Sequence, residues 1–438
     1  MGCVTELVCV NCGAAYAEGA ATTCPACGSE DGILDVRFDL DRAAETLTRD
    51  ALARRPRTHW RYRELLPLSD GFSPGASSLA TIGWTPILAA PRLAEALGVR
   101  RLRLKDEGRS ASGSFKDRAS SVGVARAMQE GFAAIACAST GNAASSLAHC
   151  AAAAGMQANI FVSQITPEGK LAQLLAYGAR VFRIRGTYAQ AYDLCTRACE
   201  RFGWHNRNAA INPYLVEGKK TGGLEVAEQC ADDPPEWVVC SVGDGCSIAG
   251  IQKGLTQMRV IGLIDWGARM LGVQAAGVAP LATAFAAAPV AGHAATSRAD
   301  ASGHATTSRA DASRGGGVAG DTYADSINVP VPRNARKALS AVRDSGGAFV
   351  TVTDEQIMRA VRDTGRLAGV FAEPAAAAAV AGVGEAVRAG VIAADADVLV
   401  VITGSGLKDV AGAVRALGGP HEIAPDLEHV ERVVRSGE

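Results

Sequence analysis

The sequence predicts an α/β protein in which two twisted, mostly parallel sheets are covered by helices. Between residues 101 and 250, short apolar runs alternate with alanine-rich helical stretches, and this repetition is typical of parallel sheets. Hydrophobic residues make up 48% of the chain but aromatic residues only 5%, which suits closely packed helices on a buried sheet. A length of 438 residues exceeds one compact core and favours two such units.

The first forty residues contain two CxxC pairs, Cys9 with Cys12 and Cys24 with Cys27, and a glycine follows each pair. Four thiolates at this spacing can close a tetrahedron around one Zn²⁺, and the glycines permit tight turns around the sulfurs. We therefore expect a zinc-ribbon-like element at residues 1–40. Its role is structural, because four protein ligands leave no open position for a substrate.

Three further regions follow along the chain. We expect residues 41–100 to form an N-terminal helical part of the larger domain. Residues 101–210 are expected to form a smaller α/β domain, with strands at 101–105, 133–138, 158–163 and 180–184 and helices at 119–130, 143–154, 168–176 and 188–202. Residues 211–438 are expected to form the larger domain, with strands at 237–241, 271–275 and 398–402. The polar tandem repeat at 292–313 predicts a disordered insertion at 289–320.

Two polar motifs in the smaller domain follow predicted strands, where open α/β sheets place their ligands. The first is SGSFKDR, in which Lys116 precedes a predicted helix. A lysine whose stem lies among apolar groups can lose its proton and act as a nucleophile. The second is Ser139-Thr140-Gly141-Asn142, whose hydroxyls and amides suit a carboxylate.

Two more motifs lie in the larger domain. A glycine-rich loop follows the strand at 237–241, and its amides can converge on a phosphate; it consists of Gly243, Asp244, Gly245, Cys246 and Ser247. The segment TGSGLKD begins with Thr403 after the strand at 398–402. This position puts the hydroxyl of Thr403 at the carboxyl end of a strand.

These four motifs, in this order and behind a CxxC…CxxC start, resemble the threonine synthase family of pyridoxal-phosphate (PLP) enzymes over nearly the whole chain. The resemblance implies PLP fold type II, the tryptophan synthase β-like fold. It implies that Lys116 forms the Schiff base with PLP and moves protons at the α, β and γ carbons of the substrate.

By the same resemblance, Asn142 would bind the 3′ oxygen of PLP, and the loop from Gly243 to Ser247 would bind its phosphate. The substrate carboxylate would be received at 139–141. Thr403 would face the ring nitrogen of the cofactor. A hydroxyl there need not keep that nitrogen protonated, so we expect elimination or replacement rather than transamination.

The site for the substrate's own phosphate departs from the family pattern. The family has a threonine where this chain has Ala143, and a serine and an arginine where it has Ala210 and Leu215. A dianionic leaving group calls for a cationic site, so we expect only weak formation of threonine from O-phosphohomoserine. The alternative is that Lys219 or Lys220, one turn further on, binds this phosphate.

We therefore expect a PLP-dependent carbon–oxygen lyase of threonine synthase type. One alternative is a β-elimination or β-replacement enzyme, such as a threonine or serine dehydratase or a cysteate synthase-like enzyme. An alternative of another class is a non-catalytic PLP-binding or interaction protein.

The charge balance and the termini indicate the surroundings of the enzyme. Forty-four basic against forty-five acidic residues give a net charge of −1, which favours neither nucleic acid nor a membrane as a partner. Residues 1–10 lack a basic segment followed by a long apolar run, and no run of about 18 apolar residues appears later. We expect a cytoplasmic homodimer that acts on a small amino-acid substrate.

Overall fold

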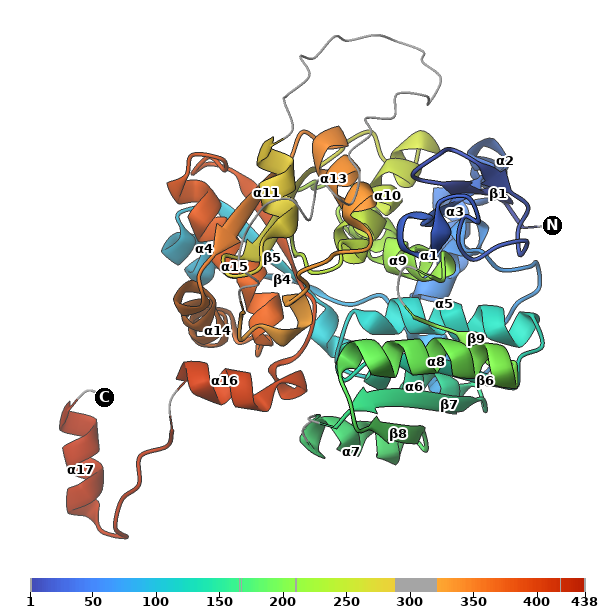
Figure 1. The fold of residues 1–438 in the computed structure, drawn as a ribbon. Coiled ribbons are helices and arrows are strands. Elements are labelled where there is room, and N and C mark those ends of the chain that lie inside the picture. Colours follow the sequence, from blue (N-terminus) through green and yellow to red (C-terminus); the bar gives the residue numbers. More distant parts are fainter. Residues whose placement is uncertain are drawn as a thin grey trace.

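The computed structural model describes residues 2–164, 166, 168–208, 211–287, 321–417 and 419–436. The insertion expected at 289–320 and Ala210 lie outside this part of the chain. Figure 1 shows two α/β bodies side by side, with the N-terminal element against one of them. Among the described helices, none is both long enough and apolar enough to cross a membrane.

The larger sheet has six strands, and all neighbours except the edge pair β4 and β5 are parallel. Their order is β12 (Ala348–Val352), β11 (Arg269–Ala275), β10 (Trp237–Ser241), β13 (Asp397–Ile402), β5 (Arg101–Asp106) and β4 (Ile87–Ala89). Every residue of the central strands β10 and β13 is buried. This is the pattern expected of parallel strands with helices on both faces.

The smaller sheet is entirely parallel within the described residues. Its order is β8 (Arg180–Ile184), β7 (Gln157–Ser163), β6 (Ala134–Ala138) and β9 (His205–Asn206), and its helices are α6 (Asn142–Ala153), α7 (Glu168–Ala176) and α8 (Tyr188–Phe202). The strand at 101–105 was predicted to belong to the smaller domain and hence to this sheet. The structure instead pairs it along its whole length with β13, so it belongs to the larger sheet.

Three closely packed helices connect the two bodies: α5 (Lys116–Gln129), α9 (Tyr214–Gln229) and α10 (Cys246–Val260). Glycines in α9 make this packing possible. A Cβ at Gly218 would lie 2.1 Å from the carbonyl oxygen of Arg118, and one at Gly223 would lie 2.0 Å from that of Ile251. Glycine inside a helix costs about 1 kcal/mol relative to alanine, and here the close approach of the backbones requires it. Helix α9 is buried on all sides, which removes the periodic pattern that would predict it.

The remaining helices cover the larger sheet and its edges (Figure 1). They are α4 (Pro91–Leu97), α11 (Pro280–Ala287), α13 (Ala335–Asp344), α14 (Asp354–Ala368), α15 (Pro374–Arg388), α16 (Val410–Leu417) and α17 (Leu427–Ser436). The alanine-rich α15 contacts β10, β11, β12 and β13, and its first seven residues are all buried. Helix α17 stands apart from the rest of the chain in Figure 1.

The N-terminal element is a three-stranded antiparallel sheet in the order β2 (Ala15–Tyr16), β1 (Val4–Cys9) and β3 (Leu34–Phe38). Short helices α1 (Gly28–Asp31), α2 (Leu40–Thr46) and α3 (Arg49–Arg54) accompany it. The carboxylate of Asp35 accepts hydrogen bonds from Lys253 Nζ of α10 at 3.1 Å and from Lys337 Nζ of α13 at 2.9 Å. These bonds fix the element to two helices of the larger body.

Candidate active site

The SGSFKDR and TGSGLKD motifs, almost 300 residues apart, lie side by side. The amide of Phe115 donates to the carbonyl oxygen of Thr403 at 2.9 Å, and the amide of Ser405 donates to that of Gly113 at 3.0 Å. Lys116 is the first residue of α5 and follows directly on this contact. The structure thus brings Lys116 to the carboxyl end of β13, at the junction of the two bodies.

The amine of Lys116 lies in a half-buried, partly cationic environment. Burial lowers its pKa most, the nearby ammonium of Lys219 lowers it further, and Glu373 opposes both, so that the pKa falls to about 8. A larger fraction of this amine is therefore unprotonated at neutral pH than for an exposed lysine. An unprotonated amine is the nucleophilic form.

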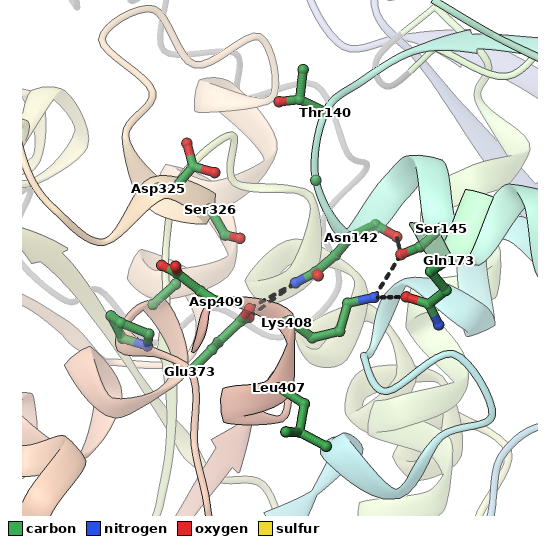
Figure 2. Close-up of a pocket in the computed structure, with 13 residues that line it drawn as sticks. Thr140, Asn142, Ser145, Gln173, Asp325, Ser326, Glu373, Leu407, Lys408 and Asp409 are labelled. Atoms are coloured by element: carbon green, nitrogen blue, oxygen red, sulfur yellow. Dashed lines mark hydrogen bonds between the residues drawn. The ribbon is translucent and has the colours of Figure 1, made fainter. Parts of the chain in front are cut away.

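A second contact joins Asn142, the first residue of α6, to Glu373 at the start of α15 (Figure 2). Asn142 Nδ2 donates to both carboxylate oxygens of Glu373, at 2.9 and 3.1 Å. Burial raises the pKa of Glu373. A Cβ at Gly404 would lie 2.5 Å from Glu373 Oε1, so this glycine lets the carboxylate sit beside the Thr403 loop.

Glu373 was not predicted from the sequence. In the sequence, Glu373 stands out only as the single acidic residue in the otherwise apolar run from Val370 to Val380. The residue is only 3% exposed, and a buried carboxylate in such a run suggests a functional or structural contact that sequence spacing alone does not reveal.

A pocket opens between the two bodies beside this contact (Figure 2), lined by Thr140, Gly141, Asn142, Ser145, Gln173, Asp325, Ser326, Glu373, Pro374, Ala375, Leu407, Lys408 and Asp409. Lys408 Nζ donates to Ser145 Oγ at 2.7 Å and to Gln173 Oε1 at 2.5 Å, so it holds the TGSGLKD segment against α6 and α7. Ser139 precedes the lining residues, and its Oγ accepts the amide of Gly141 at 3.2 Å. The predicted segment 139–142 therefore forms one wall of the pocket.

The glycine-rich loop ends at the N-terminus of α10, where Gly245 is the N-cap residue with φ +91°. A Cβ at Gly243 would lie 3.0 Å from Val329 Cγ2, and one at Gly245 would lie 2.8 Å from Ala338 Cβ. The loop therefore has no room for side chains at these two positions. The first amides of a helix have no partner within it, and with the helix dipole they favour an anion. Cys246 and Ser247 are the first residues of this helix.

Asp244 does not present its charge freely to that anion site. Its carboxylate accepts hydrogen bonds from the amide of Arg333 at 2.7 Å and from Asn334 Nδ2 at 2.8 Å. Cys246 Sγ donates to the same carboxylate at 3.0 Å, and burial raises the pKa of this thiol to about 12. Asp244 thus anchors the loop to residues 333–334.

The residues at which the sequence departs from the family pattern, and the two lysines that follow them, lie in different environments. Leu215 is buried against α5, and Ala143 is half-buried in the first turn of α6. Lys220 pairs with Glu217 at 2.6 Å, both side chains are fully buried, and Lys220 is not among the residues that line the pocket. Lys219, by contrast, lies close enough to Lys116 to influence its pKa.

The four cysteines of the N-terminal element converge. Their sulfur atoms all lie within 4.8 Å of one another, with 3.9 Å between Cys9 and Cys27 and 3.6 Å between Cys12 and Cys24. A tetrahedron with Zn–S bonds of about 2.3 Å has edges of about 3.8 Å. Asn11 Nδ2 donates to the Cys27 sulfur at 3.3 Å, as donors around metal thiolates do. The cluster therefore fits a four-thiolate metal site.

Residues 79–404 match the family described as pyridoxal-phosphate dependent enzyme. The chain is 35% identical to the threonine synthase of Methanosarcina acetivorans and 33% identical to that of Methanocaldococcus jannaschii, in each case over 98% of both chains. It is also 33% identical to the threonine synthase of Mycobacterium tuberculosis, over 83% of this chain and 92% of that one.

Solved structures share the fold at lower identity. Diaminopropionate ammonia lyase from Escherichia coli superposes with a TM-score of 0.61 at 16% identity, covering 80% of this chain and 88% of that one. A threonine deaminase from Solanum lycopersicum gives a TM-score of 0.59 at 21% identity, over 76% and 86% of the two chains.

Proposed function

This chain belongs to the family of pyridoxal-phosphate dependent enzymes, and we propose that it is a lyase of threonine synthase type that converts O-phosphohomoserine and water to threonine and phosphate. The observation that carries the proposal is the half-buried Lys116, which follows the contact with the Thr403 loop and whose pKa is lowered by burial and by Lys219. The likeness to threonine synthases over 98% of the chain supports the same reaction.

The residues around Lys116 fit PLP. The amine can join an aldehyde, the amide of Asn142 can donate to a phenolic oxygen, and the N-terminus of α10 offers amides to a phosphate. The close packing at Gly243 and Gly245 keeps side chains out of the loop that carries those amides. When bound, PLP supplies an electron sink for the carbon atoms of the substrate. We propose that the hydroxyl of Thr403 would face the ring nitrogen of PLP.

Each of the chain's own residues has a separate role in the proposed reaction. Lys116 Nζ would take protons from the α and β carbons of the substrate as the phosphate leaves the γ carbon, and return protons to the γ and α carbons, while water adds its hydroxyl to the β carbon. Glu373 fixes the amide of Asn142 through both carboxylate oxygens, which sets the direction in which that amide faces the pocket. The segment Ser139-Thr140-Gly141 would bind the substrate carboxylate, chiefly through its two hydroxyls, because the amide of Gly141 donates to Ser139 Oγ. These groups lie at the carboxyl ends of strands from both sheets. Catalysis therefore depends on the relative position of the two bodies.

A direct assay tests the proposed reaction. The purified protein with PLP should release threonine and inorganic phosphate in equal amounts from O-phosphohomoserine, at about 1 per second or faster. L-Threonine and L-serine serve as the comparison substrates. Faster release of 2-oxobutyrate or pyruvate from them than of threonine from O-phosphohomoserine would identify a dehydratase instead.

The four cysteines are proposed to hold one structural Zn²⁺. Replacing Cys9 and Cys12 by serine should remove about one zinc ion per chain and expose residues 1–40 to protease, because a closed thiolate site stabilises structure. Cys3 lies in the same element but outside the cluster, so Cys3→Ser is the matched control and should keep its zinc. Zinc content measured by atomic absorption, equal in the double variant and the wild type, would contradict the metal site.

We also propose a cytoplasmic homodimer. All twelve cysteines are free thiols, which is in keeping with a reducing compartment. Helices α16 and α17 expose several large apolar side chains, and such clusters often mark contacts between subunits; they are Val410, Val414, Leu417, Leu427, Val430 and Val434.

A further inference from the structure

Arg207 is a buried guanidinium without a carboxylate partner. Its residue is only 3% exposed, and in the described parts of the chain no Asp or Glu oxygen lies within 4.0 Å of it. Its Nη2 donates to Ser120 Oγ at 3.0 Å, while its Nε has no acceptor. Burial lowers the pKa of Arg207. A buried cation without an anion lowers the stability of a fold, so its presence calls for another explanation.

The backbone places Arg207 at the ligand-binding edge of the smaller sheet. It directly follows β9, and its amide donates to the carbonyl oxygen of Ala136 in β6 at 2.9 Å. Strand β6 then leads into the segment 139–142, which lines the pocket. Carboxyl ends of neighbouring parallel strands are where such folds bind ligands.

The side chain of Arg207 runs along α5 toward Lys116. Lys116, Ser120 and Gly123 are spaced i, i+4 and i+7, so they lie on one face of this helix. The stem packs at Gly123, where an added Cβ would lie 3.8 Å from Arg207 Cγ, and the guanidinium is bonded to Ser120. The charge therefore lies on the Lys116 side of its stem, at the level of Ser120, about one helical turn (5.4 Å) from Lys116.

The same place on α5 explains the missing family arginine. Leu215 Cδ2 would lie 3.0 Å from an added Cβ at Gly123, so Leu215 and the stem of Arg207 pack at the same point of the helix. Leu215 occupies the position at which the family pattern has its arginine. Arg207 thus returns a guanidinium to the immediate neighbourhood of the residue that has lost one.

The charges around Lys116 indicate what this guanidinium binds. Lys219 and Arg207 both lower the pKa of Lys116, whereas the carboxylate of Glu373 and the thiol of Cys246 raise it. Lys116, Lys219 and Arg207 are thus three cationic groups that influence one another, and the carboxylate of Glu373 is already held by Asn142. One dianion, the cofactor phosphate, has its own cradle at α10. The excess of positive charge suits a second dianion.

On the basis of the proposed function, we propose that Arg207 binds the phosphate monoester of the substrate, with Lys219 as a second cation, in place of the family arginine at Leu215. A guanidinium presents paired N–H donors that match two phosphate oxygens. With these two cations for the phosphate, we expect an ordinary rate of threonine formation in place of the weak one that the sequence suggested.

The test uses the holoenzyme and the variant Arg207→Gln, with inorganic phosphate as the probe. Calorimetric titration should show that phosphate binds the variant about 10- to 100-fold more weakly than the wild type, as the loss of a charge-assisted hydrogen bond implies. The KM for O-phosphohomoserine should rise by a similar factor, while cofactor content per chain stays the same. The unliganded variant should melt at the same or a higher temperature, because a buried unpaired charge has been removed.

Two further variants sharpen the result. Arg183→Gln removes an exposed arginine from β8 of the same sheet and controls for net charge; it should bind phosphate as the wild type does. Arg207→Lys keeps the charge without the paired donors and should fall between the two. Should Arg207→Gln fail to fold, Arg207→Lys still decides the matter through its phosphate affinity.

Each outcome separates the inference from the proposed function. Unchanged phosphate affinity in the Arg207 variants, or loss of cofactor in place of loss of phosphate binding, overturns the role of Arg207. If the wild type binds phosphate through Arg207 but makes no threonine, the proposed reaction is wrong and the anion site stands. If the wild type makes threonine and Arg207→Gln does so with the same KM, the reaction stands and the inference is wrong.

Discussion

The variant Lys116→Ala is expected to lose turnover by more than about 10⁴-fold, the upper end of what general acid–base catalysis alone contributes. The loss is expected to be large because, in the proposed mechanism, one amine both holds the cofactor and moves the protons. The fold should survive, since Lys116 makes no ion pair among the described residues and lies at the first position of α5. Steady-state assay and far-UV circular dichroism check the two statements.

The variant Lys116→Arg separates the nucleophile from the charge. A guanidinium keeps the positive charge but does not lose its proton in proteins, so it cannot act as the amine does. We expect this variant to be as inactive as Lys116→Ala. Mass spectrometry after borohydride reduction should find PLP on Lys116 in the wild type and on no lysine in either variant. PLP attached to Lys219 in the wild type would move the catalytic role to α9.

The strands of the two sheets were predictable because each is a short apolar run between turns. The strands predicted at 180–184 and 237–241 agree with the structure to the residue, and the helices at 168–176 and 188–202 do as well. Membership of a sheet was harder to predict. The strand Arg101–Asp106 precedes the smaller domain in the chain but pairs with β13 from the C-terminal part, and only the tertiary fold reveals such a pairing.

The residues of the candidate site also divide into those that the sequence predicted and those that only the structure revealed. Lys116, Asn142 and Thr403 stand in motifs at strand ends, so the sequence alone singled them out. Glu373 and Arg207 do not stand in such motifs. Their importance comes from contacts with residues far away in the chain, Asn142 for the first and Ser120 for the second, and from burial that no local pattern encodes.

A second large effect is expected for Arg118, which follows Lys116 by two residues and lies at the centre of a buried charge network. It donates from Nε and Nη2 to Glu107 at 2.9 and 2.8 Å, and from Nη1 and Nη2 to Glu225 at 2.7 and 2.6 Å. Lys105 Nζ donates to Glu225 at 2.8 Å. The four side chains are at most 1% exposed. Two buried carboxylates are thus balanced by two buried cations.

The variant Arg118→Met should lower the free energy of unfolding by about 3–5 kcal/mol, because it leaves two buried carboxylates facing Lys105 alone. Urea unfolding followed by fluorescence measures this loss. Arg109→Met is the matched control, since Arg109 pairs with Asp106 at 3.1 Å but its side chain is 66% exposed, and it should cost less than about 1 kcal/mol. An Arg118→Met protein as stable as the control would show that this network does not hold α5 in place. The first turn of α5 carries both Arg118 and Lys116, so the network beneath it also sets where the amine of Lys116 lies.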